Sequence, residues 1–426
     1  MNKINNISET LNKYFNQIAI TQALETGFIQ RVRKIKAPSF LKAMVLGNLE
    51  DAGSSVENIC QILHQDDIEI TKQGVEFRFT DKARSYMKTM FKEALAIFRN
   101  TLKIECGLLE KFKSIKLLDS TYITLPASME DIYRGYATSY PNQKLSTKAG
   151  MKLQVVYDYL NQNISNVDIK EGARSDQGYR DYLESIEEGE LHIADLGYFV
   201  PSSFRSIMSK KAYFISRYKS DTNIYDVHTE EKIEMLDYLK NNDKFEREVI
   251  LGKEAKLKVR MVGIKLSKDQ AEARKRKANS LAKSHGYTSS RKNQELLNWS
   301  IFITNIPSHT TSFSNIFKIY RLRWQIELLF KLYKSQVSID KFKSKINQAR
   351  ILCEFYAKLI GITIFHGVAN CVEVGAGKEF SLTKAMISFK KRVREMVDII
   401  SFNSMVMMKK FIGNLINTWS EICFKR

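Results

Sequence analysis

The chain has 426 residues, enough for about two to four domains, and 44% of them are hydrophobic, which excludes a globally disordered protein. Lysine and arginine exceed aspartate and glutamate by 20 charges, and the sequence pI is about 9.5. This surplus predicts a polyanionic partner: nucleic acid first, an anionic membrane surface second, with an inert basic surface as the remaining alternative.

The five cysteines are scattered, without a CxxC pair and without a histidine at zinc-ligand spacing, so we expect reduced, mostly buried thiols. No N-terminal segment resembles a signal peptide. The most apolar window, residues 355–375, contains Lys358, His366 and Glu373, which argues against a membrane span. We therefore expect a cytoplasmic protein with no membrane partner.

Residues 1–110 show apolar spacing near 3.6 and read as a helical N-terminal region. Within it, residues 54–65 and 70–79 could form two short helices around a tight turn, a weak indication of a helix-turn-helix. The basic stretch RVRKIK at 31–36 fits either phosphate contacts or a solvated face.

From about residue 114 the pattern changes to short β-rich segments with helices between them, which predicts a mixed α/β layer. We expect strands at 115–125, 150–160, 163–170, 191–197 and 212–218, and helical segments at 176–189 and 202–211.

Residues 219–298 interrupt this layer with alternating stretches and a very basic segment, and predict an inserted β-rich subdomain. Strand character returns at Trp299, and residues 346–426 are again helical by pattern. The predicted organisation is a helical DNA-binding region at 1–110, a core whose two parts are 111–218 and 299–345, and an insertion at 219–298 between these parts. Residues 346–426 are predicted to form a helical C-terminal region with a role in oligomerisation.

The stretch YRLRWQIELLFKLYK at 320–334 predicts an amphipathic helix with an unusual polar edge. At about 100° per residue, its side chains Tyr320, Arg323, Glu327 and Lys334 fall within roughly a 60° arc beside the apolar stripe. They form either a site or part of a solvated face, because Arg323 and Glu327 also have the spacing of an ordinary i,i+4 ion pair.

Two aspartates favour a site. Asp119 interrupts an apolar, β-branched strand pattern, where an ionised carboxylate is costly unless a cation or hydrogen bonds compensate it. Asp195 ends a second strand, the usual place for a ligand in an open α/β sheet, although a turn or cap role is the alternative. Together with Glu327 they could make an all-oxygen site for two Mg²⁺ ions, with Mn²⁺ as a substitute, for phosphodiester chemistry.

On these residues the sequence resembles the DDE transposases of the IS-four family of bacterial insertion sequences. Tyr320, Arg323, Glu327 and Lys334 match that family's signature Y-x2-R-x3-E-x6-K at every spacing. The segments LLDSTYITLP and LHIADLGYF resemble its blocks around the first and second aspartates. The C-terminal 80 residues match least clearly.

The resemblance implies an RNase H-like, retroviral-integrase-like core with a β-rich insertion between Asp195 and Glu327, flanked by helical regions. It also implies cut-and-paste DNA transposition: binding of terminal inverted repeats by a homodimer, metal-dependent cleavage, hairpin ends and strand transfer into target DNA. Asp119, Asp195 and Glu327 would hold the metals, and Tyr320, Arg323 and Lys334 would contact DNA. Such a protein would be cytoplasmic and associated with the nucleoid when bound to DNA.

Hairpin formation needs a displaced base, which an aromatic ring can stabilise by stacking. Trp299 is the first candidate and Trp324 the second. Core packing is an equal alternative for Trp299 and the favoured reading for Trp324. Lys331 also lies on the polar edge, where it would contact DNA or pair with Glu327. Two other functions stay open: an RNase H-like nuclease without strand transfer, and a non-catalytic or domesticated DNA-binding protein.

Overall fold

The computed structural model describes residues 2–424 except 32–33, 51–54, 99–106, 137–147, 241, 285, 287, 289 and 374–378. The chain divides into two compact units. The first comprises Met1–Glu105, Ser120–Arg174 and Glu327–Arg426, and the second Cys106–Asp119 and Ser175–Ile326. Strand β1 (Ile115–Thr124) and helix α12 (Trp324–Leu332) each continue from one unit into the other.

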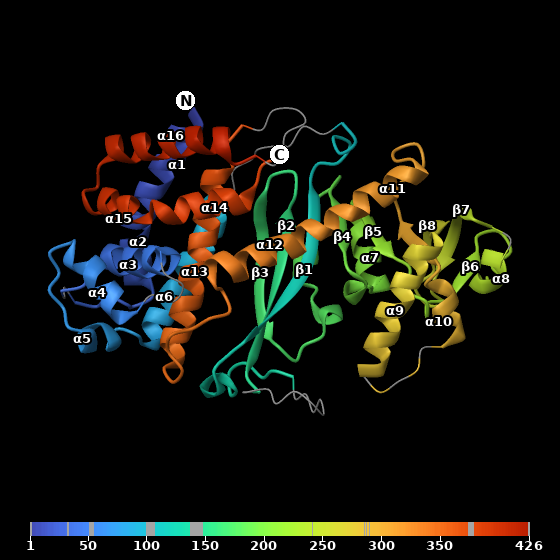
Figure 1. The fold of residues 1–426 in the computed structure, drawn as a ribbon, viewed down its shortest axis with the longest axis horizontal. Helices are drawn as coiled ribbons and strands as arrows, with labels where there is room; N and C mark the ends of the chain where they lie inside the picture. The colour runs from blue at the N-terminus through green and yellow to red at the C-terminus, as the bar shows by residue number, and fades with distance from the viewer. Residues whose placement is uncertain are drawn as a thin grey trace. The chain divides into compact units, whose positions relative to one another are not determined.

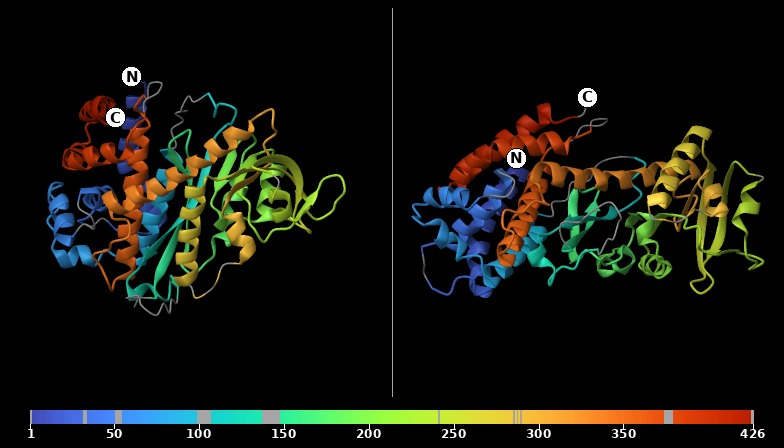
Figure 2. Two further views of the ribbon diagram at one scale, coloured as in Figure 1. Left: turned by 45° about the vertical axis from the view of Figure 1, so that its right-hand side comes forward. Right: turned by 60° about the horizontal axis from the view of Figure 1, so that its bottom comes forward.

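The first unit is mostly helical, and its helices come from both ends of the chain (Figure 1). The N-terminal helices are α1 (Asn2–Lys13), a π-turn at Tyr14–Ile18, α2 (Ala19–Glu25), α3 (Ala37–Glu50), α4 (Val56–His64), α5 (Lys72–Glu76) and α6 (Asp81–Ile97). The C-terminal helices are α13 (Gln348–Ala369), α14 (Leu382–Lys391), α15 (Val393–Ser401) and α16 (Met405–Ile422). Contacts of α1 with α16 and of α3 with α15 join the two sets, as the blue and red ribbons of Figure 2 show.

Helix α13 is the centre of this unit and packs against α3 and α6. Its length and composition would be enough to cross a membrane, but its most apolar window is entirely buried inside the protein. Its charged residues are compensated locally: Arg350 Nε donates to Glu354 at 2.9 Å, and Lys358 Nζ donates to the carbonyl of Ser338 at 3.1 Å. The structure therefore uses α13 as a core helix.

The sheet portion of the first unit has the strand order β3-β2-β1, where β2 is Gly150–Asp158 and β3 is Asn163–Glu171. Strands β2 and β3 pair in antiparallel fashion, and every residue of β2 is buried. The ring of Tyr122 on β1 leaves no room for a side chain at Gly150, where a Cβ atom would lie 1.9 Å from the tyrosine hydroxyl. Glycine is required there because of this close approach.

The second unit contains one sheet with the strand order β1-β4-β5-β9-β8-β7-β6. Strands β1, β4 and β5 are parallel, and all later neighbours are antiparallel. The strands are β4 (Leu191–Ala194), β5 (Tyr213–Arg217), β6 (Ile224–Asp226), β7 (Lys244–Leu251), β8 (Leu257–Lys265) and β9 (Trp299–Thr304). Its helices are α7 (Pro201–Ser209), α8 (Met235–Lys240), α9 (Lys268–Ser284), α10 (Arg291–Leu296) and α11 (Phe313–Tyr320).

The predicted mixed α/β architecture with helical flanks is confirmed, as are the expected strands. The prediction of a helical segment at 176–189 is wrong: this stretch contains only two 3₁₀ turns, Asp176–Gly178 and Asp181–Ser185. Its buried side chains Tyr179, Tyr182 and Ile186 have helical spacing, but the i,i+3 geometry of short 3₁₀ turns brings residues at this spacing to one face as well.

The strands predicted for the insertion form β7 and β8, and β8 pairs with β9, so they extend the sheet that starts at β1. The predicted domain boundaries stay a prediction. The cysteines within the described residues are free thiols, as predicted. Cys353, Cys371 and Cys423 are buried, and Cys60 is partly exposed. Cys106 and, in the basic stretch, Arg33 lie outside the described residues.

Candidate functional site

The two aspartates of the predicted triad directly follow the last paired residues of two neighbouring strands of the second unit. Strands β1 and β4 run parallel with Leu118 opposite Ala194 as their last pair, and each aspartate is the next residue. Neighbouring strands are about 4.8 Å apart, so the two carboxylates project from one place on the sheet. Asp119 is 19% exposed, and two such partly buried anions repel each other unless cations neutralise them.

Two of the predicted DNA-contacting residues lie beside this pair. A guanidinium nitrogen of Arg323 is 3.8 Å from a carboxylate oxygen of Asp119. The hydroxyl of Tyr320 donates to the carbonyl of Ala194 at 3.4 Å, directly before Asp195. Burial, reinforced by the negative charge of Asp195, raises the pKa of Tyr320 to about 12, so its hydroxyl stays protonated and can donate.

The sequence analysis missed two further cations at this place, Arg217 and Arg274. Arg217 ends β5, the strand next to β4, and its charge lowers the pKa of Tyr320. Arg274, on α9, donates to the carbonyl of Trp299 at 3.0 Å, and burial together with Arg217 lowers its pKa. The strand-end argument used for Asp195 applies equally to Arg217, whereas nothing local separates Arg274 from its basic neighbours.

The predicted helix through residues 320–334 is present, and its winding changes along the segment. The segment contains the end of α11, a 3₁₀ turn at Arg321–Arg323, α12, and a π-turn beginning at Tyr333. Each signature residue falls in a different one: Tyr320 in α11, Arg323 in the 3₁₀ turn, Glu327 in α12 and Lys334 in the π-turn. Because the 3₁₀ turn winds more tightly and the π-turn more loosely than an α-helix, the angles worked out at 100° per residue are only approximate.

Glu327 and Lys334 belong to the first unit. Glu327 is partly buried on α12. Lys334 Nζ donates at 3.2 Å to the carbonyl of Tyr122, three residues beyond Asp119 on β1. Lys331 is exposed. The structure thus brings together Asp119, Asp195, Tyr320 and Arg323, while the approach of Glu327 to the aspartates stays a prediction.

The two tryptophan candidates differ in burial. Trp299 is 6% exposed, packs against the ring of Phe245 at 6.0 Å, and lines a hollow of about 270 Å³ that also includes Arg217. Trp324 is 56% exposed, so the expectation that it packs in the core is wrong. A buried ring that lines a hollow is compatible with both readings of Trp299.

The donors at this site suit a hard divalent cation, because Asp119 and Asp195 offer only carboxylate oxygens. Within the described residues, however, no group of three or more His, Cys, Asp or Glu side chains has a metal-binding arrangement. The aspartate pair would supply two ligands, and Arg323 balances part of their charge.

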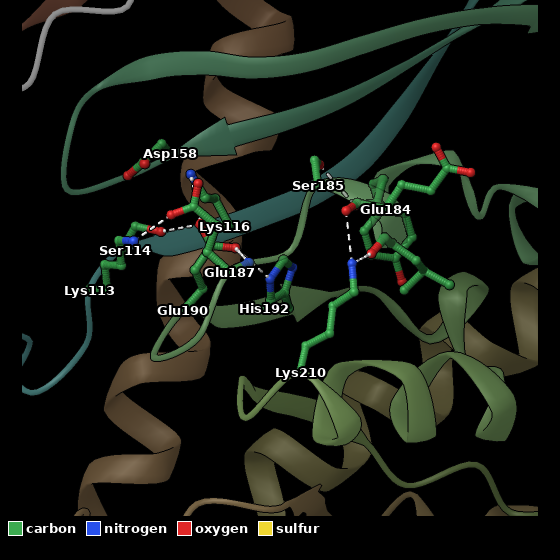
Figure 3. Close-up of polar contacts among 12 residues, drawn as sticks. Lys113, Ser114, Lys116, Asp158, Glu184, Ser185, Glu187, Glu190, His192 and Lys210 are labelled. Carbon is green, nitrogen blue, oxygen red and sulfur yellow. Dashed lines mark hydrogen bonds and ion pairs between the residues drawn. The ribbon is translucent and has the colours of Figure 1, made fainter.

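A second polar cluster lies at the opposite ends of β1 and β4 (Figure 3). The buried carboxylate of Glu190 accepts a hydrogen bond from the hydroxyl of Ser114 at 3.0 Å. It also lies 3.2 Å from His192 Nε2 and 3.4 Å from Lys116 Nζ. Burial alone would raise the pKa of Glu190, but the His192 hydrogen bond and the Lys116 charge lower it to about 2. Lys116 pairs with His192 in the ladder, three positions before Asp119 and Asp195, so we expect this cluster to stabilise the register that brings the two aspartates together.

Known proteins resemble this chain over most of its length. It is 28% identical over 367 residues to the transposase for insertion sequence element IS231B of Bacillus thuringiensis subsp. berliner, covering 80% of this chain and 75% of that protein. It is 25% identical over 390 residues to the transposase for insertion sequence element IS1151 of Clostridium perfringens, covering 85% and 80%.

A solved structure of a piggyBac transposase synaptic complex with hairpin DNA aligns with a TM-score of 0.47 and 10% identity, over 97% of this chain and 85% of that chain. That similarity is too low to support any statement about function. The transposase DDE domain matches residues 110–363, more than half of the chain and the region that holds both aspartates, Arg323 and Glu327. The chain therefore belongs to the transposase DDE domain family.

Proposed function

We propose that this protein is a divalent-metal-dependent DNA transposase of the IS-four family with an RNase H-like core. The observation that carries the proposal is the register of β1 and β4, which sets Asp119 beside Asp195 with Arg323 and Tyr320 next to them. Family membership over residues 110–363 supports the same conclusion.

Asp119, Asp195 and Glu327 are the residues that would hold two Mg²⁺ or Mn²⁺ ions. Bound metal would supply a more acidic water for phosphodiester hydrolysis and charge compensation at the leaving oxygen. The guanidinium of Arg323 offers a planar fork for a phosphate beside the carboxylates, and Lys334 offers a point charge. Tyr320, kept protonated by its raised pKa, donates a hydrogen bond.

The DNA partners are the terminal inverted repeats of the element and the target DNA, bound by a homodimer. The net charge of +20 supports a polyanionic partner. The reaction is cut-and-paste: water attacks at the 3′ end of the element, and the freed 3′-OH then attacks the opposite strand to close a hairpin. After the hairpin is reopened, the 3′-OH joins to the target.

Trp299 is the residue we assign to the displaced base of the hairpin step. It lines the 270 Å³ hollow together with Leu196, the residue after Asp195. Trp299→Ala should spare first-strand nicking and impair hairpin formation, and Trp324→Ala, at the second and exposed candidate, is measured beside it. Equal loss of both steps in Trp299→Ala would refute the assignment.

The test of the whole proposal uses DNA that carries the ends flanking this gene, incubated with protein and Mg²⁺ or Mn²⁺. Wild type is compared with Asp195→Asn and Glu327→Gln, and with Glu230→Gln, an exposed carboxylate on a turn, as control. We expect nicking, then hairpin and joined products, lost only in the first two variants. Cleavage without joining would indicate a nuclease, and binding without cleavage in the wild type would indicate a non-catalytic DNA-binding protein.

A further inference from the structure

One large aromatic side chain among the N-terminal helices is exposed to solvent. Phe77, in the turn between α5 and α6, is 82% exposed. Leaving a phenyl ring in water costs about as much as burying a core side chain gains, roughly 2 kcal/mol. A single exposed apolar side chain is ordinary on a protein surface, so the residues around Phe77 decide whether this place receives a partner.

The turn that carries Phe77 is held on both sides. Val75 is fully buried, and Phe79 is 5% exposed, with its ring 6.2 Å from that of Phe40 and the Arg350 guanidinium 5.4 Å from its centroid. Thr80 caps α6 by accepting from Ala83 N at 3.3 Å. Because residues on both sides of Phe77 are anchored, its exposure is a fixed feature of the fold.

Phe77 and Arg78 form a ridge between two hollows, which we name the Phe77 ridge. Both residues line a hollow of about 830 Å³ on one side and one of about 440 Å³ on the other. The first hollow also contains Lys34 and His64, and the second Arg31 and Lys82. Of the described residues that line the two hollows, Glu69 is the acidic one, so both sides of the ridge are positively charged.

We propose that the Phe77 ridge docks duplex DNA, with one phosphate backbone in each basic hollow and the phenyl ring directed into the groove between them. Two strands of phosphate that flank a groove match two basic hollows that flank a ridge. An apolar wedge such as phenylalanine is what minor-groove proteins insert at a base step. A protein partner would need an acidic surface with a hole for one ring, whereas any DNA duplex presents this charge pattern.

This inference rests on the proposed function, since it takes the terminal repeat of the element as the DNA. It locates recognition in the N-terminal helices, on residues of the first unit only. Of the basic stretch at 31–36, Arg31 and Lys34 face the hollows, which assigns phosphate contact to them.

The experiment measures binding of a duplex that carries the terminal repeat to full-length protein, by fluorescence anisotropy across a range of salt. The variants are Phe77→Ala, Phe77→Trp and the double Lys34→Gln/Lys82→Gln. Phe402→Ala is the matched control, because Phe402 is also a phenylalanine after a helix and is 72% exposed. Thermal unfolding of each variant checks that the fold is kept.

We expect Phe77→Ala to weaken binding about 5- to 100-fold, and Phe77→Trp and Phe402→Ala to bind like wild type. The double lysine variant should reduce the slope of log K against log salt by about 0.9 for each lost phosphate contact. Equal affinities for Phe77→Ala and Phe402→Ala would overturn the inference while leaving the cleavage reaction intact. Conversely, a wild type that binds through Phe77 but never cleaves would overturn the transposase function and leave the docking surface standing.

Discussion

Replacing Glu190 by glutamine tests whether the buried cluster of Figure 3 holds β1 and β4 in register. The carboxylate is 5% exposed and accepts from Ser114 while lying beside Lys116 and His192. Its pKa of about 2, in place of an ordinary 4.5, means that the folded state favours the ionised form. At 1.36 kcal/mol for each pKa unit this corresponds to at most about 3 kcal/mol, and relaxation around the neutral amide reduces the expected loss to about 1–3 kcal/mol.

The lowered pKa of Glu190 also predicts how its contribution to the free energy of unfolding changes with pH. Because the folded pKa is lowered, the stabilisation by Glu190 is complete above about pH 4.5 and is lost as the pH falls towards 2. The difference in unfolding free energy between wild type and Glu190→Gln should therefore be fully developed at pH 5. Below pH 4.5 it should shrink by about 1.4 kcal/mol for each pH unit.

The assay is urea unfolding followed by tryptophan fluorescence, with amide hydrogen exchange in β1 and β4 to locate the change. Glu187→Gln is the control, since Glu187 is 60% exposed and its ion pair with Lys113 lies at the surface, where screening by water makes such pairs weak. Equal stability of wild type and Glu190→Gln at pH 7, or a difference that does not change below pH 4.5, would refute the reasoning.

Three other changes probe separate parts of the structure. Gly150→Ala places a methyl group 1.9 Å from the Tyr122 hydroxyl and should destabilise the protein by about 1–3 kcal/mol in thermal unfolding; an unchanged melting temperature would contradict this packing. Tyr320→Phe removes a long hydrogen bond of 3.4 Å, so stability should fall by less than about 1 kcal/mol while the nicking rate falls about tenfold or more; equal nicking rates would exclude the hydroxyl from the reaction. Burial lowers the pKa of His366 to about 4, so stability should decrease as the pH falls from about 6.5 towards 4; His366→Gln, which keeps an acceptor for Tyr333, should remove that slope in urea titrations, and an unchanged slope would place its origin elsewhere.

The parallel strands β1 and β4 carry polar groups at both ends, and the two groups differ in how fully their negative charge is compensated. At the start of the strands, Glu190 is compensated by Lys116 and by hydrogen bonds, which makes a closed, buried cluster. Further along, Asp119 and Asp195 lie beside each other, with Arg323 near Asp119. The compensated cluster around Glu190 is expected to stabilise the register. The aspartate pair keeps two carboxylates together, which costs stability unless a cation binds.

The sequence by itself determined the expected strands and most of the helices, the identity of Asp119 and Asp195 as unusual carboxylates, and the spacing of the signature residues. These depend on local patterns, because alternation and 3.6-residue periodicity state which side chains face the core wherever the element lies. Only the tertiary structure decided that Asp195 stands opposite Asp119, since strand register depends on cross-strand contacts such as those of Glu190. It also added Arg217 and Arg274 to the site, tightened the signature helix into a 3₁₀ turn at Arg321–Arg323, and left Trp324 in solvent while burying Trp299. These outcomes depend on which segments meet in space, and a pattern within one segment carries no information about its partners.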